Sequence, residues 1–494
     1  MGVEINQTSF SAADYTAYRR RLEENLAALQ QQLARPDFGS APASIGAELE
    51  MYIVDAQGMP LYANREIRAE ADEPQLTLEL NRYNLEYNLS PYNVTASPFM
   101  ATEQEILAGL ARVRTVAENH GGRIVPIGIL PTLRATDFGP HCITQCPRYR
   151  ALVKQLIKRR SGEFRIDING EQALKLELSD ITLEGANTSF QVHYRVRPEA
   201  YADTFNAIQV ATPLALAIGA NSPTLFGHRL WHETRIPLFK QSIDTRHVDR
   251  YSWREPARVN FGQGWVRRGA VELFREVVRI YPALLPVCAP CSPAEELLRG
   301  LAAPSLAELR LHQSTVWLWN RPVYDDADGG HLRIEMRALP AGPSAVDMAA
   351  NAAFLIGLAE GLRPHMAELL PALPFARAEY NFYRAAQHGL EAKLLWPTRG
   401  QSGFSEQAVT DIIEQMLPLA RTGLDTIGIE PAESERYLGI IEQRLQRRQT
   451  GATWQRRKLA GATDELASKE ALHEMLEEYI AHSSANLPVA EWPV

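Results

Sequence analysis

The chain has 494 residues, of which 45% are hydrophobic and 22% charged. This composition predicts a soluble globular protein with a large core, and the length indicates two or three domains or one large enzymatic domain with additions. A formal net charge of −8 gives no support for binding to nucleic acid or to an acidic membrane surface.

We recognise no signal peptide, lipidation signal or membrane-spanning segment in the sequence. The N-terminus has no apolar segment typical of a signal peptide, and Asn6 stands where a myristoylation signal needs Ser or Thr. The longest apolar run, around 210–220, is too short to span a bilayer. We therefore expect a cytoplasmic protein without a membrane partner.

Four cysteines occur as two pairs, Cys142/Cys146 and Cys288/Cys291. Together they could form a four-thiolate zinc site, since the second pair has Cys-x-x-Cys spacing. The loose first spacing and the long separation of the pairs favour free cytosolic thiols instead.

The first predicted elements are a helix and an acidic strand. Apolar residues recur every three to four positions from Leu22 to Leu33, which predicts an amphipathic helix. Over 46–54, alternation places Glu48, Glu50, Tyr52 and Val54 on one strand face. Carboxylates at i and i+2 lie about 7 Å apart, too far to share one proton but well placed to reach one or two divalent cations.

Further elements follow before residue 130. Residues 76–80 and 84–90 alternate in the same way, and in the second of these Glu86 shares a face with Asn84 and Asn88. Residues 102–105 resemble a capping box and predict the start of a helix that stops at 121–122. Residues 124–130 read as a strand, in which Pro126 favours an edge or a strand start.

The remaining pattern predicts an α+β fold with a helical C-terminal part. Strands are expected over 174–179, 190–196 and 332–336, and a small-residue helix over 345–362. Because the strands have one apolar and one polar face, we expect an antiparallel or mixed sheet covered by helices on one side. Prolines between 364 and 374 mark a change to helices, so the predicted division is a catalytic domain, 1–374, and a helical C-terminal region, 375–494.

Two of these strands carry polar residues that complement the acidic one. Gln191, His193 and Arg195 share one face of their strand, and Arg333, Glu335 and Arg337 share one face of theirs. Carboxylates with one His or Gln suit Mg²⁺ or Mn²⁺ better than zinc. Arginines between them suit a polyanion such as the phosphates of a nucleotide.

The polar face of any one of these strands is explained by exposure to solvent. Several such strands, each with an apolar face suited to the core, together favour a metal and nucleotide site. The sequence contains no phosphate-binding glycine loop, dinucleotide fingerprint, kinase signature, zinc-protease motif or serine-hydrolase elbow. Metals and sheet side chains are therefore expected to hold any nucleotide. The basic runs at 444–448 and 456–458 are expected to be solvated helix faces rather than a phosphate site.

The chain resembles the glutamate–cysteine ligase family, in its type-2 branch of carboxylate–amine ligases. The resemblance rests on an ordered set of short motifs spread over roughly 45–460, at 46–52, 85–91, 127–131, 188–193, 217–235 and 334–337. It implies a mostly antiparallel, glutamine-synthetase-like catalytic sheet. It also implies ATP-dependent phosphorylation of a carboxylate, usually the glutamate side chain, followed by attack of an amine such as cysteine.

The resemblance also implies roles for individual residues. The metal ligands would be Glu48, Glu50, Glu86, His193 and Glu335. Gln191 and Arg333 would lie beside the bound ATP, Arg337 would stabilise charge on the transferred phosphoryl group, and Arg235 would grip a substrate carboxylate or phosphate. The partners would be small-molecule substrates, with no nucleic acid, and a homo-oligomer stays open.

Segments 227–230 and 317–322 are not features of the cysteine-using enzymes, and they leave the amine open. Trp317, Trp319 and Arg321 could line an amine pocket, although core tryptophans are as good an interpretation. Two other functions remain: a metal- and ATP-dependent phosphotransferase or amide hydrolase on the same fold, and a catalytically silent sensor of a nucleotide or an amino acid.

Overall fold

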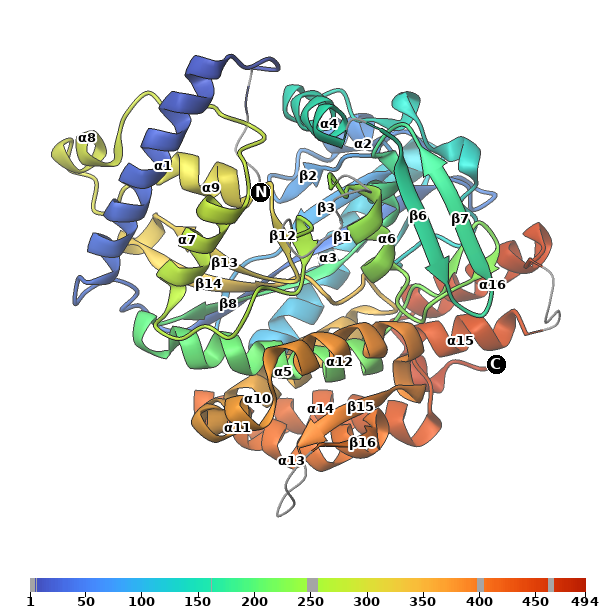
Figure 1. The fold of residues 1–494 in the computed structure, drawn as a ribbon. Coiled ribbons are helices and arrows are strands. Elements are labelled where there is room, and N and C mark those ends of the chain that lie inside the picture. Colours follow the sequence, from blue (N-terminus) through green and yellow to red (C-terminus); the bar gives the residue numbers. More distant parts are fainter. Residues whose placement is uncertain (1–4, 6, 161, 247–255, 398–403, 461–465) are drawn as a thin grey trace.

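An eight-stranded antiparallel sheet lies at the centre of the computed structural model, which describes residues 5, 7–160, 162–246, 256–397, 404–460 and 466–494 (Figure 1). The strand order is β13-β14-β8-β1-β3-β2, with β4 and β5 also paired to β1. The strands are β1 (Ser44–Val54), β2 (Leu76–Leu78), β3 (Asn84–Asn88), β4 (Tyr92–Asn93), β5 (Arg123–Val125), β8 (Phe190–Val196), β13 (Asn320–Asp325) and β14 (His331–Met336). Every pairing among them is antiparallel, which confirms the predicted α+β fold.

The register of the strands gathers the polar side chains on one face. Glu50 lies opposite Glu86 across β1 and β3, and Glu48 lies opposite Gln191 across β1 and β8. His193 in turn lies opposite Glu335 across β8 and β14. Because side chains alternate between the faces of a sheet, this register places the acidic residues together.

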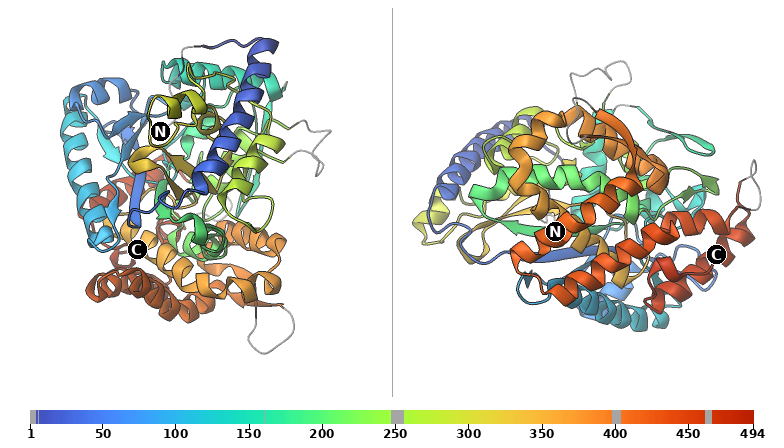
Figure 2. Two further views of the ribbon diagram at one scale, coloured as in Figure 1. Left: turned by 90° about the vertical axis from the view of Figure 1, so that its left-hand side faces the viewer. Right: turned by 90° about the horizontal axis from the view of Figure 1, so that it is seen from below.

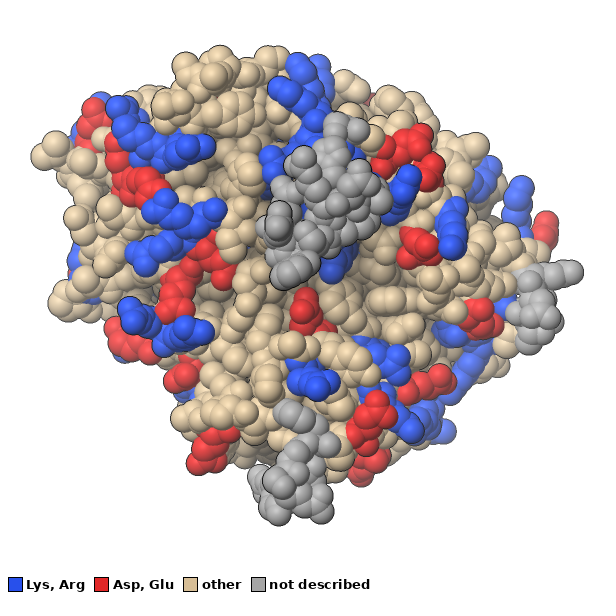
Figure 3. Space-filling view, viewed as in Figure 1, with Lys and Arg blue, Asp and Glu red and all other residues tan. Residues whose placement is uncertain are grey.

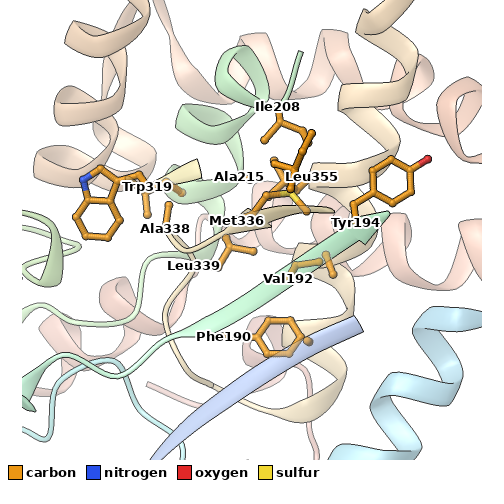
Figure 4. Close-up of a cluster of buried hydrophobic side chains, with 14 of the residues drawn as sticks. Phe190, Val192, Tyr194, Ile208, Ala215, Trp319, Met336, Ala338, Leu339 and Leu355 are labelled. Atoms are coloured by element: carbon orange, nitrogen blue, oxygen red, sulfur yellow. The ribbon is translucent and has the colours of Figure 1, made fainter. Parts of the chain in front are cut away.

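The other face of the sheet is apolar and is covered by three helices, α3 (Pro98–Asn119), α5 (Tyr201–Gly219) and α10 (Ala345–Leu362). Figure 4 shows Val192 and Met336 of the sheet among Ile208 of α5 and Leu355 of α10. Every residue of α10 is buried. Full burial of each large apolar side chain contributes about 1.5–3 kcal/mol, so this layer holds the strands in place.

Further elements border the polar face and the ends of the sheet (Figure 1). Side chains of α4 (Pro147–Arg160), α7 (Ala270–Ile280) and α9 (Ala307–Gln313) line the cavities on the polar face. The other helices of the first three quarters of the chain are α1 (Ala12–Leu33), α2 (Asn64–Ala71), α6 (Arg235–Ser242), α8 (Pro293–Leu298) and α11 (Met366–Ala372). Short pairings join β6 (Phe164–Asn169) to β7 (Ala173–Leu178), β9 (Thr224–Leu225) to β10 (His228–Arg229), and β11 (Val259–Asn260) to β12 (Trp317–Leu318).

The C-terminal region is mainly helical and faces the viewer in the right-hand view of Figure 2. Its helices are α12 (Phe375–His388), α13 (Val409–Ile427), α14 (Pro431–Arg447), α15 (Gly451–Lys458) and α16 (Lys469–Ser484). The hairpin of β15 (Lys393–Pro397) and β16 (Phe404–Ala408) interrupts them and was not predicted. The boundary at residue 374 stays a prediction.

Helices α10 and α13 touch through their backbones. A Cβ atom at Gly423 of α13 would overlap the carbonyl oxygen of Gly357 of α10, and one at Gly361 would overlap that of Leu419. A buried ion pair joins the same regions, because Arg444 of α14 lies 2.7 Å from the Asp347 carboxylate of α10. The C-terminal region is therefore an integral part of the core.

The structure corrects two predicted element boundaries. Helix α3 begins at Pro98 after Ser97, four residues before the proposed capping box, and Thr102 is buried within the helix. Glu105 instead accepts hydrogen bonds from the backbone and side chain of Ser90, so its carboxylate anchors the segment after β3. The strand expected over 124–130 is only three residues long, because Pro126 has no amide hydrogen to continue the pairing.

The helical stretch Ala345–Ala372 has the length and the hydropathy of a membrane span, with a mean hydropathy of 1.4. The most apolar part of this stretch is completely buried inside the protein, and the stretch includes α10, the central helix of the core.

Candidate active site

Glu48, His193 and Glu335 form the first cluster on the polar face. One ligand atom from each lies within 4.8 Å of the others, and Nε2 of His193 lies 3.2 Å from Oε1 of Glu48. The three side chains come from the neighbouring strands β1, β8 and β14. Apart from this contact with Glu48, neither ring nitrogen of the buried His193 has a hydrogen-bond partner within the described residues, and an imidazole nitrogen can ligate a cation.

Two arginines balance the charge of the first cluster. Arg321, directly opposite Glu335 in the register of β13 and β14, places Nη2 at 2.6 Å from Oε2 of Glu335, and Arg337 contacts the other oxygen. Burial alone would raise the pKa of Glu335, but the two guanidinium groups outweigh it and lower that pKa to about 2. Burial likewise opposes ionisation of Glu48, but the contact with His193 and the charge of Arg337 contribute to a pKa well below the usual range.

Glu50, Glu79 and Glu86 form the second cluster, again with one ligand atom from each within 4.8 Å of the others. Glu50 accepts hydrogen bonds from the Ser189 amide at 2.6 Å and from Nε2 of Gln191 at 2.9 Å. Glu86 accepts hydrogen bonds from the side chains of Thr77 and Asn88, each at 3.0 Å. These hydrogen bonds fix the carboxylates in place but bring no positive charge.

Carboxyl groups of the second cluster hold their protons more tightly than an ordinary glutamate does. Burial and then the charge of Glu86 raise the pKa of Glu50 to about 7. Burial followed by the charge of Glu86 raises the pKa of Glu79 well above its usual value, and burial with the charge of Glu48 raises that of Glu86. Crowded carboxylates in a poorly solvated site repel one another, and a bound cation would remove that repulsion.

The donor sets of both clusters fit Mg²⁺ or Mn²⁺. These cations prefer hard oxygen ligands and accept an imidazole, and apart from Glu79 the carboxylates of both clusters lie on strands. Glu48 belongs to the first cluster and Glu50 to the second, so the paired carboxylates of β1 connect two neighbouring groups that could each hold a cation.

Two cavities open over the polar face and share the residues Glu48, Ser314 and Arg321. The first, of about 320 Å³, holds the first cluster together with Arg310 and Arg333. The second, of about 660 Å³, holds the second cluster together with Arg337. Over the face shown in Figure 3, acidic and basic side chains are interspersed.

The remaining predicted site residues occupy different positions. Gln191 donates to Glu50 and accepts from Arg337, so it links the two clusters. Arg333 lines the first cavity and lies 3.2 Å from the carboxylate of Asp325. Arg235 is 2% exposed, lines neither cavity, and donates to Glu233 and to the backbone oxygens of Arg337 and Ala338. Arg235 thus supports the backbone at Arg337 and Ala338, and its contact with a substrate stays a prediction.

The structure also gives the positions of the two tryptophans and the arginine that could line an amine pocket, and of the four cysteines that could form a zinc site. Trp319 is a core residue, 2% exposed and packed against Phe239 and Phe382, whereas Trp317 and Arg321 line the second cavity. No disulfide joins the four cysteines, and none of them belongs to a group of potential metal ligands in the described part of the chain.

Sequence reasoning missed several charged residues of the cavities, among them Glu79, Glu184 and Arg310. Glu79 could have been found, because alternation over 76–80 places it on the same face as Thr77, which pairs with Glu86. Glu184 lies on the 3₁₀ turn η3 (Thr182–Ala186), where there is no strand period to follow. Burial and then the charge of Glu50 raise the pKa of Glu184 to about 8. Arg310 comes from α9, and only the tertiary fold brings it to the sheet.

Solved structures with the same fold include a glutamate–cysteine ligase from Francisella tularensis in complex with AMP. It aligns with a TM-score of 0.54 and 11% identity over 93% of this chain and 91% of that chain. A bifunctional glutathione synthetase from Pasteurella multocida aligns with a TM-score of 0.46 and 13% identity over 94% of this chain and 55% of that one. The chain therefore shares the fold of the first of these structures.

The chain belongs to glutamate–cysteine ligase family 2, whose sequence profile matches residues 44–482. Comparison with curated proteins gave no match. Membership of this family gives the general activity, ATP-dependent ligation of a carboxylate to an amine, while the two substrates have to be inferred from the site.

Proposed function

We propose that the protein uses ATP and Mg²⁺ or Mn²⁺ to activate the side-chain carboxylate of glutamate as an acyl phosphate and joins it to an amine. The observation that carries this proposal is the pair of metal-capable clusters on one strand face, with Arg321 and Arg337 between them. Family membership supports the reaction type. The choice of glutamate as the acid rests on the family and on the basic residues Arg68, Arg148 and Arg337 of the second cavity.

The two cavities would bind different substrates. The first cavity presents Arg310, Arg321 and Arg333, and guanidinium groups bind phosphate oxygens bidentately, so it suits the nucleotide. The second cavity is about twice as large and suits the acid together with the amine. The reacting groups would then meet at the shared wall of Glu48 and Arg321.

In the first step a carboxylate oxygen of the acid attacks the γ-phosphorus of ATP, and the bond to the bridging oxygen breaks to release ADP. Arg337 and Arg321 would stabilise the negative charge that spreads over the transferred phosphoryl oxygens. Cations held by the two clusters would supply additional charge neutralisation. In the second step the amine nitrogen attacks the carbonyl carbon, the bond to the phosphate oxygen breaks, and the nitrogen gives up a proton as phosphate leaves.

Hydroxylamine provides a test that needs no knowledge of the natural amine, because this small nucleophile traps an acyl phosphate as a hydroxamate. With ATP, Mg²⁺ and L-glutamate, we expect ADP and glutamyl hydroxamate in equal amounts. Omission of glutamate should reduce both products to background, and aspartate should replace glutamate poorly.

Other outcomes would identify the alternative functions. ADP formation with transfer of phosphate to a stable product would show a phosphotransferase, and cleavage of an amide without ATP would show a hydrolase. Nucleotide-dependent stabilisation without any product would show a sensor. A cytoplasmic location, and the absence of nucleic-acid and membrane partners, stay predictions.

A further inference from the structure

One wall of the second cavity is apolar, in contrast to its acidic floor. Tyr149, Leu152 and Leu156 line it from α4 at positions i, i+3 and i+7, which places them on one helix face. The Tyr149 hydroxyl donates to the Leu78 backbone oxygen at 2.8 Å, so its polar atom already has a partner. Ile181, Ile243 and Trp317 also line the cavity, which gives space for a hydrocarbon group.

Glu184 lines the same cavity but belongs to neither metal-capable cluster. Its turn, η3, is held firmly, because Asn81 donates to the Thr182 backbone oxygen at 2.9 Å and the Tyr52 hydroxyl donates to that of Ala186 at 2.6 Å. A Cβ atom at Gly185 would collide with the side chain of Asn81, which shows how closely the turn packs. The carboxylate of Glu184 is thus presented from a rigid support.

We infer that the amine substrate is a primary amine with a hydrocarbon substituent, whose nitrogen is held by Glu184 and whose substituent lies against the apolar wall. This inference rests on the proposed function. The carboxylates of both clusters would be engaged with cations, which leaves Glu184 as the acidic partner for an ammonium group. An amino acid such as cysteine would bring a further carboxylate, which would compete with the glutamate substrate for Arg68, Arg148 and Arg337 of the same cavity.

A series of amines tests the inference on the unaltered enzyme. With ATP, Mg²⁺ and glutamate fixed, kcat/KM for amide formation is measured for methylamine, n-butylamine, 3-methylbutylamine and benzylamine. We expect about a fourfold increase for each methylene group that becomes buried. Two matched pairs isolate polarity: n-butylamine should exceed 3-amino-1-propanol, and 3-methylbutylamine should exceed leucine, which adds only the α-carboxylate, by at least tenfold. A preference for cysteine or glycine over every hydrocarbon amine would overturn the inference.

Two variants test the residues themselves. Glu184→Gln and Leu152→Asn should each lower the ratio of 3-methylbutylamide formation to hydroxamate formation at least tenfold. The matched controls Glu177→Gln, at an exposed position on β7, and Leu107→Asn, at a half-buried position on α3, should leave that ratio unchanged. The ratio is insensitive to partial loss of folded enzyme, because both products come from the same preparation.

The hydroxamate reaction distinguishes a failure of the proposed ligase function from a failure of the inference about the amine. If no acid yields hydroxamate, the proposed function fails. If hydroxamate forms but hydrocarbon amines have no advantage, only the inference fails. A Glu184→Gln enzyme that needs much more Mg²⁺ for hydroxamate formation would assign Glu184 to a cation site and would also overturn the inference.

Discussion

The first and second clusters lie on neighbouring strands of one sheet, yet the carboxyl pKa values that characterise them move in opposite directions. Arg321 and Arg337 contact the first cluster and lower the pKa of Glu335 to about 2. The second cluster has hydrogen-bond donors but no comparable ion pair within the described residues, and burial followed by the charge of Glu86 raises the pKa of Glu50 to about 7. The difference shows that the protein neutralises one acid group with its own guanidinium groups and supplies less compensating charge to the other, where we expect a cation to bind.

The largest expected effect comes from the first cluster. Glu335→Gln removes the charge that both arginines contact, so we expect kcat for hydroxamate formation to fall by about 10³-fold. Glu360→Gln is the control, because Glu360 is also buried and paired with an arginine, Arg363 at 2.9 Å, but lies on α10. If the control loses activity to the same extent, the loss reflects broken buried ion pairs and not the site.

The second cluster should respond in both activity and stability. Glu79→Gln should reduce activity about 10²-fold but stabilise the metal-free protein at pH 8 by about 1–3 kcal/mol, since it removes a carboxylate whose ionisation is opposed. Unfolding in urea with EDTA present would measure the stability. Glu177→Gln on the exposed hairpin should change neither quantity, and a destabilised Glu79→Gln protein would contradict the picture of mutual repulsion.

Removal of one arginine should make the first cluster resemble the second. Arg321→Gln should raise the pKa of Glu335, because one of its two compensating charges is lost, and should reduce kcat/KM by about 10–100-fold. The loss should be greater at pH 6 than at pH 8, where Glu335 would still be ionised. Arg165→Gln, in an exposed ion pair of the β6–β7 hairpin, serves as the control, and a pH-independent loss would contradict the electrostatic role.

The smallest expected effect is a pH dependence of stabilisation by Mg²⁺. The folded pKa values of Glu50 and Glu184, about 7 and about 8, lie above the ordinary value of 4.5, so the folded state binds more protons and the metal-free protein loses stability as pH rises from about 4.5 to about 8. Mg²⁺ needs the ionised carboxylates and relieves their repulsion. The increase in Tm with Mg²⁺ should therefore be about 2–4 °C larger at pH 8 than at pH 6 in a thermal scan, and an equal increase would contradict the assignment.

Much of the sheet could be predicted because its strands alternate cleanly. The predicted strand at 190–196 and the helix at 345–362 have the bounds found in the structure, and alternation assigned Glu48, Glu50, Glu86, His193 and Glu335 to one face. The clustering of these five residues follows from the register of the strands. Their roles as metal ligands stay predictions.

Features that depend on packing could not be predicted. The pairing of Arg321 with Glu335 requires the register of β13 and β14, which two separate strands do not reveal. The apolar stripe of α4 is short and lies among six basic residues, so it carries a weak helical signal on its own. The burial of Arg235 could not be predicted either, because it depends on the ion pair with the neighbouring Glu233, and the substrate contact implied by the resemblance stays a prediction.

The backbone contact between α10 and α13 has a consequence for how the chain matures. A chain that has emerged from the ribosome only as far as residue 374 carries the Ala345–Ala372 stretch without the helix that covers it. That stretch has the apolarity of a membrane span, and an exposed segment of this kind promotes aggregation before folding is complete. The last quarter of the chain thus covers α10, and synthesis must reach it before that helix can be buried on the side facing α13.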